Sequence, residues 1–340
     1  MSSDESDEAP ISASSLDHYS RQLRSLLKDP AVTELCLQRP GEIFIERHSG
    51  WSRISAPWAT QEWARNFARL VATATEQRVN PETPLLSAAL PSGERVQVVL
   101  PPATWRDGVV IAIRRPSSEI WSLADLASHG AFSTCRAVDP HSEPVATALT
   151  ASYYAGDWRA FLAESVRSRL NVLVAGATGS GKTTLTKALI EEIPAHERLI
   201  SIEDAAELAF RRHPNSVRLF YSKDDQGLAR VTPKQLLEAS LRLRPDRILL
   251  AELRGEEAYY FLRNVSSGHP GSITSIHAGS AALAFDQLAL LVKESPAGRE
   301  MALAEIHRLV RAVVDVVVHC ARDCGTRRVS ELWWRDAPPN

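Results

Sequence analysis

Eight consecutive residues, Gly176 to Thr183, have the types and spacing of a loop that binds phosphate groups. They read GATGSGKT, which fits the pattern G-x-x-x-x-G-K-[ST]. The glycines let the backbone curl until its N–H groups point at phosphate oxygens, and a helix that starts there adds positive potential. Lys182 can then reach the β- and γ-phosphates of a nucleotide, and the Thr183 hydroxyl can hold Mg²⁺. The predicted nucleotide-binding residues are Gly176, Ala177, Thr178, Gly179, Ser180, Gly181, Lys182, Thr183 and Thr184.

Carboxylates follow two further apolar segments, in places where they could support hydrolysis. Glu203 and Asp204 come after residues 198–202, and Glu252 comes after residues 247–251. Ligands of open α/β sheets bind at the carboxyl ends of the strands, so we expect these side chains beside the phosphate loop. Such a carboxylate can order the Mg²⁺ shell or polarise the attacking water. The alternative at both places is a surface carboxylate just past a strand.

A histidine ends a third segment of the same kind. His277 follows residues 272–276, which have the composition of a strand, and its ring can donate to a γ-phosphate or to the attacking water. A structural histidine is the alternative, but the position at a third strand end favours a functional one. His269 lies in a loop with glycine and proline, where the structural interpretation is the stronger of the two.

The elements around these residues alternate between helix and strand. Residues 172–175 form an apolar strand that leads into the phosphate loop, and a helix leaves the loop and ends at Pro194. The same order repeats from Trp158 onward, which predicts a mostly parallel sheet in an α/β domain over residues 157–335. Strand, loop and helix in this order are what phosphate binding requires.

The N-terminal part of the chain has a different pattern. Residues 1–14 are acidic and rich in serine, which predicts a disordered tail. Residues 15–132 contain two helical patterns, over 16–28 and 60–78, and two hairpins, which predicts a small α+β domain with an antiparallel sheet. Residues 133–156 lack clear periodicity and are expected to form a linker.

Composition limits the remaining possibilities. The chain has 340 residues, 44% hydrophobic and 24% charged, which suits two globular domains and argues against a disordered or fibrous protein. The charge of −2 gives no overall basic field, so strong nucleic-acid binding is not expected. The apolar runs are too short to cross a bilayer, the N-terminus has no signal pattern, and the four cysteines complete no zinc site. We therefore expect reduced thiols and a cytoplasmic location.

The motifs together resemble one protein family. GATGSGKTT, RLISIEDAAEL, LRLRPDRILLAELRGEEAYYFLR and SGHPGSITSIHAGS follow the order and spacing of the VirB-type traffic ATPases of bacterial type IV secretion and conjugation systems. Within the secretion ATPase superfamily, the chain looks most like the eleventh VirB component and its relatives. The resemblance is strong over residues 155–295, and GERVQVVLPPAT and IAIRRPS extend it into the N-terminal domain.

The resemblance implies a fold, an activity and an assembly. The fold would be a RecA-like P-loop domain with a smaller α+β N-terminal domain packed on it, and the nucleotide would lie between the two domains of a subunit. The protein would be a homohexameric ATPase with Mg²⁺, peripheral at the inner face of the inner membrane, that powers translocation or pilus assembly. Its partners would be other type IV secretion ATPases and inner-membrane channel components. The matching catalytic residues are Lys182, Glu203, Asp204, Glu252 and His277, and Thr183, Glu203 and Glu252 match metal-holding positions.

In this family, arginines of the N-terminal domain reach the phosphates and couple domain closure to ATP. The matching residues are Arg95 in GERVQ and either Arg114 or Arg115 in IAIRRPS. Side chains alternate along a strand, so only one of the last two can face the nucleotide. Motif spacing favours Arg114. A solvated arginine at a strand edge is the alternative.

The sequence departs from the family pattern in three places. Ala251 stands where the family often has glycine before Glu252, no acidic residue directly precedes Glu252, and there is no four-cysteine zinc module. The last absence argues against a type II secretion ATPase. Two other functions stay open: a pilus assembly or retraction motor, and a docking ring that binds nucleotide with little turnover. The cargo and the nucleotide base do not follow from the sequence.

Overall fold

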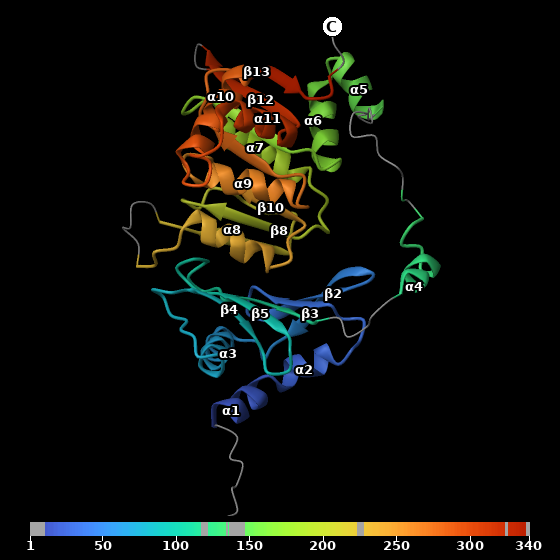
Figure 1. Cartoon of the computed structure of the whole chain (residues 1–340), viewed down its shortest axis with the longest axis vertical. Helices are drawn as coiled ribbons and strands as arrows, with labels where there is room; N and C mark the ends of the chain where they lie inside the picture. The colour runs from blue at the N-terminus through green and yellow to red at the C-terminus, as the bar shows by residue number, and fades with distance from the viewer. Residues whose placement is uncertain are drawn as a thin grey trace, which may run out of the picture.

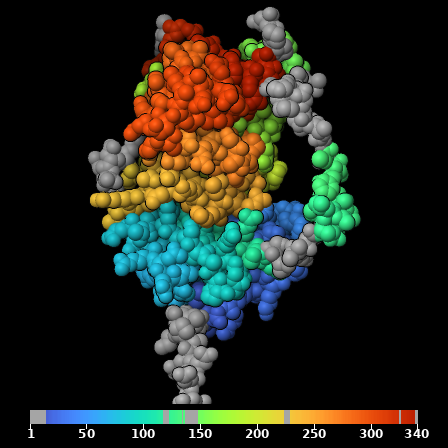
Figure 2. Space-filling view, viewed as in Figure 1, coloured from blue at the N-terminus to red at the C-terminus, as the bar shows by residue number. Residues whose placement is uncertain are grey.

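Two layered units, joined by a long connection, make up the chain (Figure 1). The computed structural model describes residues 11–116, 122–133, 135, 147–222, 228–323 and 326–337. In the space-filling view, the N-terminal unit lies directly against the C-terminal unit (Figure 2). The two units correspond to the predicted α+β and α/β parts of the chain.

A six-stranded antiparallel sheet forms the body of the N-terminal unit, in the order β3-β2-β1-β6-β5-β4. The strands are β1 (Glu34–Leu37), β2 (Gly41–Arg47), β3 (Gly50–Ala56), β4 (Leu85–Ala89), β5 (Arg95–Val99) and β6 (Val110–Arg114). Both predicted hairpins are confirmed, since β1 pairs with β2 and β5 with β6. The strands that sequence reasoning missed, β3 and β4, are the two edges, where a weaker apolar pattern is ordinary.

Helices cover one face of this sheet, and the C-terminal unit covers the other (Figure 1). The helices are α1 (Ile11–Tyr19), α2 (Arg21–Leu27) and α3 (Gln61–Ala74). Along β1, Leu35 and Leu37 pack in the helix-side core, whereas Cys36 packs in the core shared with the C-terminal unit. This alternation follows from the two-residue period of a strand.

Three predicted boundaries in this unit need correction. Residues 11–14 lie in α1 and not in the predicted tail, of which residues 1–10 fall outside the described range. The helix predicted over 16–28 is two helices, which meet at Ser20. Thr60 caps α3 as predicted, through a bond from the Trp63 N–H, but α3 ends at Ala74. Glu76 has a φ of 54°, which no α-helix continues through.

The connection between the units contains two helices among its described residues. They are α4 (Leu123–Ser128), which lies apart from both sheets, and α5 (Thr147–Tyr154), which packs on α6 (Trp158–Arg167) (Figure 1). The predicted linker over 133–156 therefore includes one packed helix at its end. Much of its earlier part falls outside the described residues.

The C-terminal unit contains two sheets that are parallel apart from the last strand. One sheet has the order β10-β8-β9, and the other has the order β11-β7-β12-β13. The strands are β7 (Val172–Gly176), β8 (Leu199–Glu203), β9 (Ser216–Phe220), β10 (Arg247–Leu250), β11 (Ile273–Ile276), β12 (Val316–Asp323) and β13 (Thr326–Trp334). A parallel bridge between Leu253 and Ile276 joins the two sheets beside β10 and β11. The predicted α/β class is confirmed.

Helices lie on both faces of these strands (Figure 1). Besides α6 they are α7 (Lys182–Glu191), α8 (Pro233–Leu241), α9 (Glu257–Ser266), α10 (Ala281–Glu294) and α11 (Leu303–Val313). Two apolar cores result, one on each face, and the four strands β7, β8, β10 and β11 between them are wholly buried, whereas most of β13 is exposed. In the described part of the chain, no helix is long and apolar enough to cross a membrane.

Polar contacts between the two units are made mainly by arginines. Arg244, just before β10, donates two hydrogen bonds to Glu46 of β2, with the shorter at 2.6 Å. Arg198 is fully buried, donates to the Gln38 side chain at 2.5 Å and lies over the ring of Trp51. These contacts fix the N-terminal unit against the amino ends of β8 and β10.

Candidate active site

The phosphate loop connects the end of β7 to the start of α7, as its sequence requires. Gly179 and Gly181 have φ values of 75° and 104°, which only glycine adopts without strain. A Cβ on Gly176 would lie 2.5 Å from the Cys320 carbonyl oxygen on neighbouring β12. Glycine is therefore needed at these positions for the turn and for close approach of two strands.

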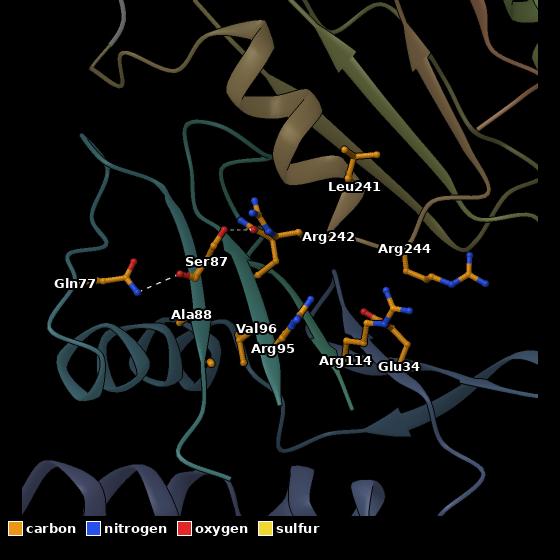
Figure 3. A pocket seen from close by; sticks show the side chains of 12 residues that line it. Glu34, Gln77, Ser87, Ala88, Arg95, Val96, Arg114, Leu241, Arg242 and Arg244 are labelled. Atoms are coloured by element: carbon orange, nitrogen blue, oxygen red, sulfur yellow. Dashed lines mark hydrogen bonds between the residues drawn. The ribbon is translucent and has the colours of Figure 1, made fainter. Parts of the chain in front are cut away.

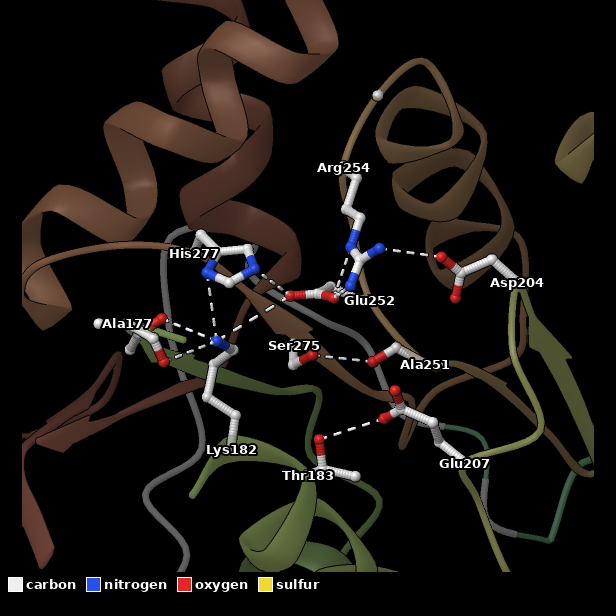
Figure 4. A network of polar contacts seen from close by, with 12 residues as sticks. Ala177, Lys182, Thr183, Asp204, Glu207, Ala251, Glu252, Arg254, Ser275 and His277 are labelled. Atoms are coloured by element: carbon white, nitrogen blue, oxygen red, sulfur yellow. Dashed lines mark hydrogen bonds and ion pairs between the residues drawn. The ribbon is translucent and has the colours of Figure 1, made fainter. Parts of the chain in front are cut away.

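Lys182 is the first residue of α7, and its ammonium group turns back into the loop (Figure 4). Nζ donates to the carbonyl oxygens of Gly176 at 2.9 Å and Ala177 at 3.1 Å. Burial lowers the pKa of Lys182, although the negative charge of Glu252 acts in the opposite direction. The ammonium is thus held where the phosphates of a bound nucleotide would lie.

Glu252 and His277 meet Lys182 at the carboxyl ends of three strands (Figure 4). Oε1 of Glu252 lies 2.8 Å from Nε2 of His277 and 4.0 Å from Nζ of Lys182. The other ring nitrogen of His277 lies 3.3 Å from Nζ of Lys182. The structure therefore brings together three of the residues that the sequence selected, although they lie as much as 95 positions apart.

Arg254 is a functional candidate that sequence reasoning missed. Its Nε donates to Oε2 of Glu252 at 2.5 Å, and its Nη1 donates to Asp204 at 2.9 Å (Figure 4). Partial burial acts against the charge of Arg254, but the hydrogen bond and charge of Glu252 raise its pKa. Arg254 thereby links Asp204 to the cluster of Lys182, Glu252 and His277, which is called the Lys182 group below. A cation two residues after a candidate catalytic carboxylate is the signal that could have found it.

Glu203 has no described contact with the phosphate loop, beside which the sequence led us to expect it. Its side chain is fully buried and accepts two bonds of 2.7 Å from the Arg218 guanidinium. It also accepts from the Ser201 hydroxyl and from the N–H groups of Glu207 and Leu208. Both oxygens of this carboxylate thus accept hydrogen bonds from protein groups. The assignment of Glu203 as a metal ligand stays a prediction, which would require some of these bonds to be exchanged for Mg²⁺.

Besides Glu252, a second carboxylate that faces the loop is that of Glu207. Its Oε2 accepts a hydrogen bond of 3.2 Å from the Thr183 hydroxyl (Figure 4). Mg²⁺ prefers oxygen ligands and takes only one or two from a protein when a nucleotide supplies the others. A hydroxyl and a carboxylate oxygen side by side at the start of α7 fit that requirement. Sequence reasoning missed Glu207, and its position at the end of the acidic segment EDAAE is the signal that could have found it.

Arg95 and Arg114 lie together, but in a cavity that is separate from the phosphate loop. They line a cavity of about 520 Å³ between the two units, with Arg242 and Arg244 on its other wall (Figure 3). Arg115 points elsewhere and donates to the Asp29 carbonyl oxygen. The expected alternation of the two neighbouring arginines is therefore present, and Arg114 is the one that shares a cavity with Arg95.

Within one chain, these arginines do not approach the phosphate loop. Arg242 and Arg244 precede β10, whereas Glu252 follows it, so the cavity and the Lys182 group lie at opposite ends of the strands. β10 alone spans about 13 Å at 3.3 Å per residue. The predicted contact of Arg95 and Arg114 with phosphate stays a prediction, and the arrangement within one chain does not make this contact.

Comparison with known proteins shows the family to which this chain belongs. The profile described as type II/IV secretion system protein matches residues 18–336. VirB11 of Brucella suis is 44% identical over 334 residues, which cover 96% of this chain and 92% of that protein. This chain belongs to the VirB11 family of type IV secretion ATPases. The resemblance stated from its motifs is confirmed.

Other relatives and a solved structure extend the comparison. VirB11 of Bartonella quintana is 43% identical over 323 residues, 92% of this chain and 90% of that protein. PtlH of Bordetella pertussis is 38% identical and covers 98% of this chain and 99% of its own length. The crystal structure of the Brucella suis VirB11 ATPase with sulphate superposes with a TM-score of 0.90 over 95% of both chains. The VirB11 family member described here is therefore an ATP hydrolase with a RecA-like domain.

Proposed function

We propose that this ATPase powers substrate translocation or pilus assembly by a type IV secretion system, as a homohexameric ring at the inner face of the inner membrane. One observation carries the catalytic part of the proposal: Lys182, Glu252 and His277 converge at the strand ends. The family supports the role in secretion. Contacts with other secretion ATPases and with channel components at the membrane belong to the same proposal.

The geometry suggests how the residues divide the work. Glu252 orients a water for in-line attack on the γ-phosphorus and accepts its proton as the bond to the β–γ bridging oxygen breaks. His277 holds Glu252, and Lys182 stabilises the charge that develops on the phosphate oxygens. Thr183 and Glu207 would hold Mg²⁺, which when bound neutralises phosphate charge.

Arg95 and Arg114 place a condition on this mechanism. They belong to the proposed nucleotide site, yet in one chain the length of the strands separates them from the phosphate loop. They would reach phosphates bound by a second subunit of the ring, or those of their own chain after a movement of the N-terminal unit. Mixing Arg114→Ala with Lys182→Ala subunits distinguishes these routes, because only contact across subunits restores turnover in mixed rings.

Nucleotide turnover by the purified protein tests the function. Wild type is compared with Lys182→Ala and Glu252→Gln, and Lys187→Ala is the matched control, an exposed lysine on the same helix. We expect both site variants to lose activity by about tenfold or more, with Glu252→Gln still binding nucleotide. Mass measured with and without an ATP analogue reports the ring. Rings without turnover above the Lys182→Ala background would instead support the nucleotide-gated docking ring.

A further inference from the structure

The loop that carries Glu207 is held by a single buried carboxylate. Both backbone N–H groups at Glu207 and Leu208 donate to Oε2 of Glu203, each at 2.9 Å. The side chain of Glu207 meets the Thr183 hydroxyl from this loop. The position of Glu203 therefore decides whether Glu207 lies opposite Thr183.

Glu203 is in turn held by Arg218 of β9. The guanidinium donates to both carboxylate oxygens, through Nε and Nη2, at 2.7 Å each. This fork-to-fork geometry allows little movement of one group without the other. Arg218 lies on the edge strand of its sheet, directly beside the N-terminal unit.

Two rings lie on the Arg218 guanidinium, one from each unit: Phe220 of β9, with its centre 5.3 Å from Cζ, and Trp105 of the N-terminal unit. The Arg218 Cζ lies 4.8 Å from the ring centre of Trp105, a half-exposed residue in the loop between β5 and β6. The same loop is bound to β9 at two points: the Thr104 hydroxyl donates to the Arg218 carbonyl, and the Phe220 N–H donates to the Ala103 carbonyl, both at 3.0 Å. Docking of the N-terminal unit thus places an aromatic ring on Arg218.

We propose that Trp105 and Arg218 are positioning residues for ATP hydrolysis, and that they transmit docking of the N-terminal unit to the nucleotide site. The route consists of direct contacts, from Trp105 to Arg218, to Glu203, to Glu207 and to Thr183. The inference rests on the proposed role of Thr183 and Glu207. It gives the buried Glu203 a function that needs no contact with ligand.

A matched pair of tryptophans separates this role from plain stabilisation of the domain contact. Trp51 also belongs to the N-terminal unit and also lies on an arginine of the C-terminal unit, with Arg198 Cζ 5.5 Å from its ring centre. The described hydrogen-bond partners of Arg198 do not include Glu203, Glu207 or Thr183. Trp105→Ala and Trp51→Ala therefore each remove one cation–π contact between the units, but only the first breaks the route.

Steady-state ATP turnover tests the route in the full-length protein. We expect Trp105→Ala to lower kcat by about tenfold with little change in KM, Trp105→Phe to recover most of it, and Trp51→Ala to stay near wild type. In a Glu207→Gln background, Trp105→Ala should have no further effect, since the route already ends there. Equal effects of the two tryptophan variants, or full additivity with Glu207→Gln, would overturn the inference.

Hydrogen exchange gives a second readout that does not depend on activity. The amides of Glu207 and Leu208 should exchange about tenfold faster in Trp105→Ala and at the wild-type rate in Trp51→Ala. Unchanged exchange in both variants would contradict the proposal. The two failures can be told apart. If wild type is no more active than Lys182→Ala, the proposed function falls and this inference falls with it. If Lys182→Ala is inactive but Trp105→Ala is normal, only this inference falls.

Discussion

The hydroxyl of Thr183 donates a hydrogen bond of 3.2 Å to the carboxylate of Glu207. This contact joins the phosphate loop to the acidic segment after β8, and it does so through the second glutamate of that segment. The first glutamate, Glu203, is buried with Arg218. The two carboxylates are four residues apart in the chain and have different partners, Thr183 for Glu207 and Arg218 for Glu203.

Substitution of the two glutamates should separate their roles. Glu207→Gln should leave stability near wild type and raise the Mg²⁺ concentration needed for half-maximal turnover by about tenfold, because a charged oxygen beside Thr183 is lost. Glu203→Gln should lower the free energy of unfolding by about 3 kcal/mol, because the largely buried guanidinium of Arg218 loses its charged partner. Turnover over a Mg²⁺ series and urea unfolding measure the two effects. The reverse pattern would support Glu203, and not Glu207, as the metal-site residue.

Arg254 should act on catalysis and not on nucleotide binding. Its guanidinium holds Glu252 and Asp204 but has no described bond to the phosphate loop. Arg254→Ala is expected to reduce kcat by about 10- to 100-fold because Glu252 loses its orientation, and Arg254→Lys to recover only part of it.

The matched control for this prediction is Arg263→Ala, an exposed arginine on α9. Binding of a fluorescent ATP analogue and steady-state turnover separate affinity from kcat. A variant that loses affinity while it keeps its maximal rate would count against a role in orienting Glu252.

Glu34 should make stability depend on pH. Burial raises the pKa of Glu34 from 4.5 to about 7. Between these values the unfolded chain ionises while the folded protein keeps the proton, so stability falls as pH rises through that window. The difference in free energy of unfolding between Glu34→Gln and wild type should therefore be about 2 to 3 kcal/mol more in favour of the variant at pH 8 than at pH 5. Urea unfolding at both pH values measures this, and an equal difference at both would disprove it.

Gly176 should tolerate no side chain. A Cβ there would lie 2.5 Å from both the Cys320 carbonyl oxygen and the Ser180 hydroxyl oxygen. Gly176→Ala is expected to lower the free energy of unfolding by about 2 kcal/mol and to weaken nucleotide binding, because either the loop or β12 must move. Gly279→Ala is the control, since the nearest atom to its Cβ would be Leu283 Cδ1 at 3.6 Å. Thermal unfolding and analogue binding would show similar values for both variants if the close contact were unimportant.

Local sequence was sufficient for the phosphate loop and for the strands that end beside it. The loop is one continuous segment, so its glycines, lysine and threonine are neighbours both in the sequence and in the structure. Glu252 and His277 were found because parallel strands have their carboxyl ends at one edge, so a polar residue after an apolar run has a predictable place. Family resemblance came from the same contiguous motifs.

Only the tertiary structure decided which acidic side chain meets the loop and where the N-terminal arginines lie. Glu203 is buried because Arg218, 15 residues away on β9, holds it, and Arg254 matters because Asp204 and Glu252 come from different strands. The position of Arg95 and Arg114 depends on how one unit docks on the other. Each outcome depends on contacts between residues distant in the chain, which local spacing does not encode.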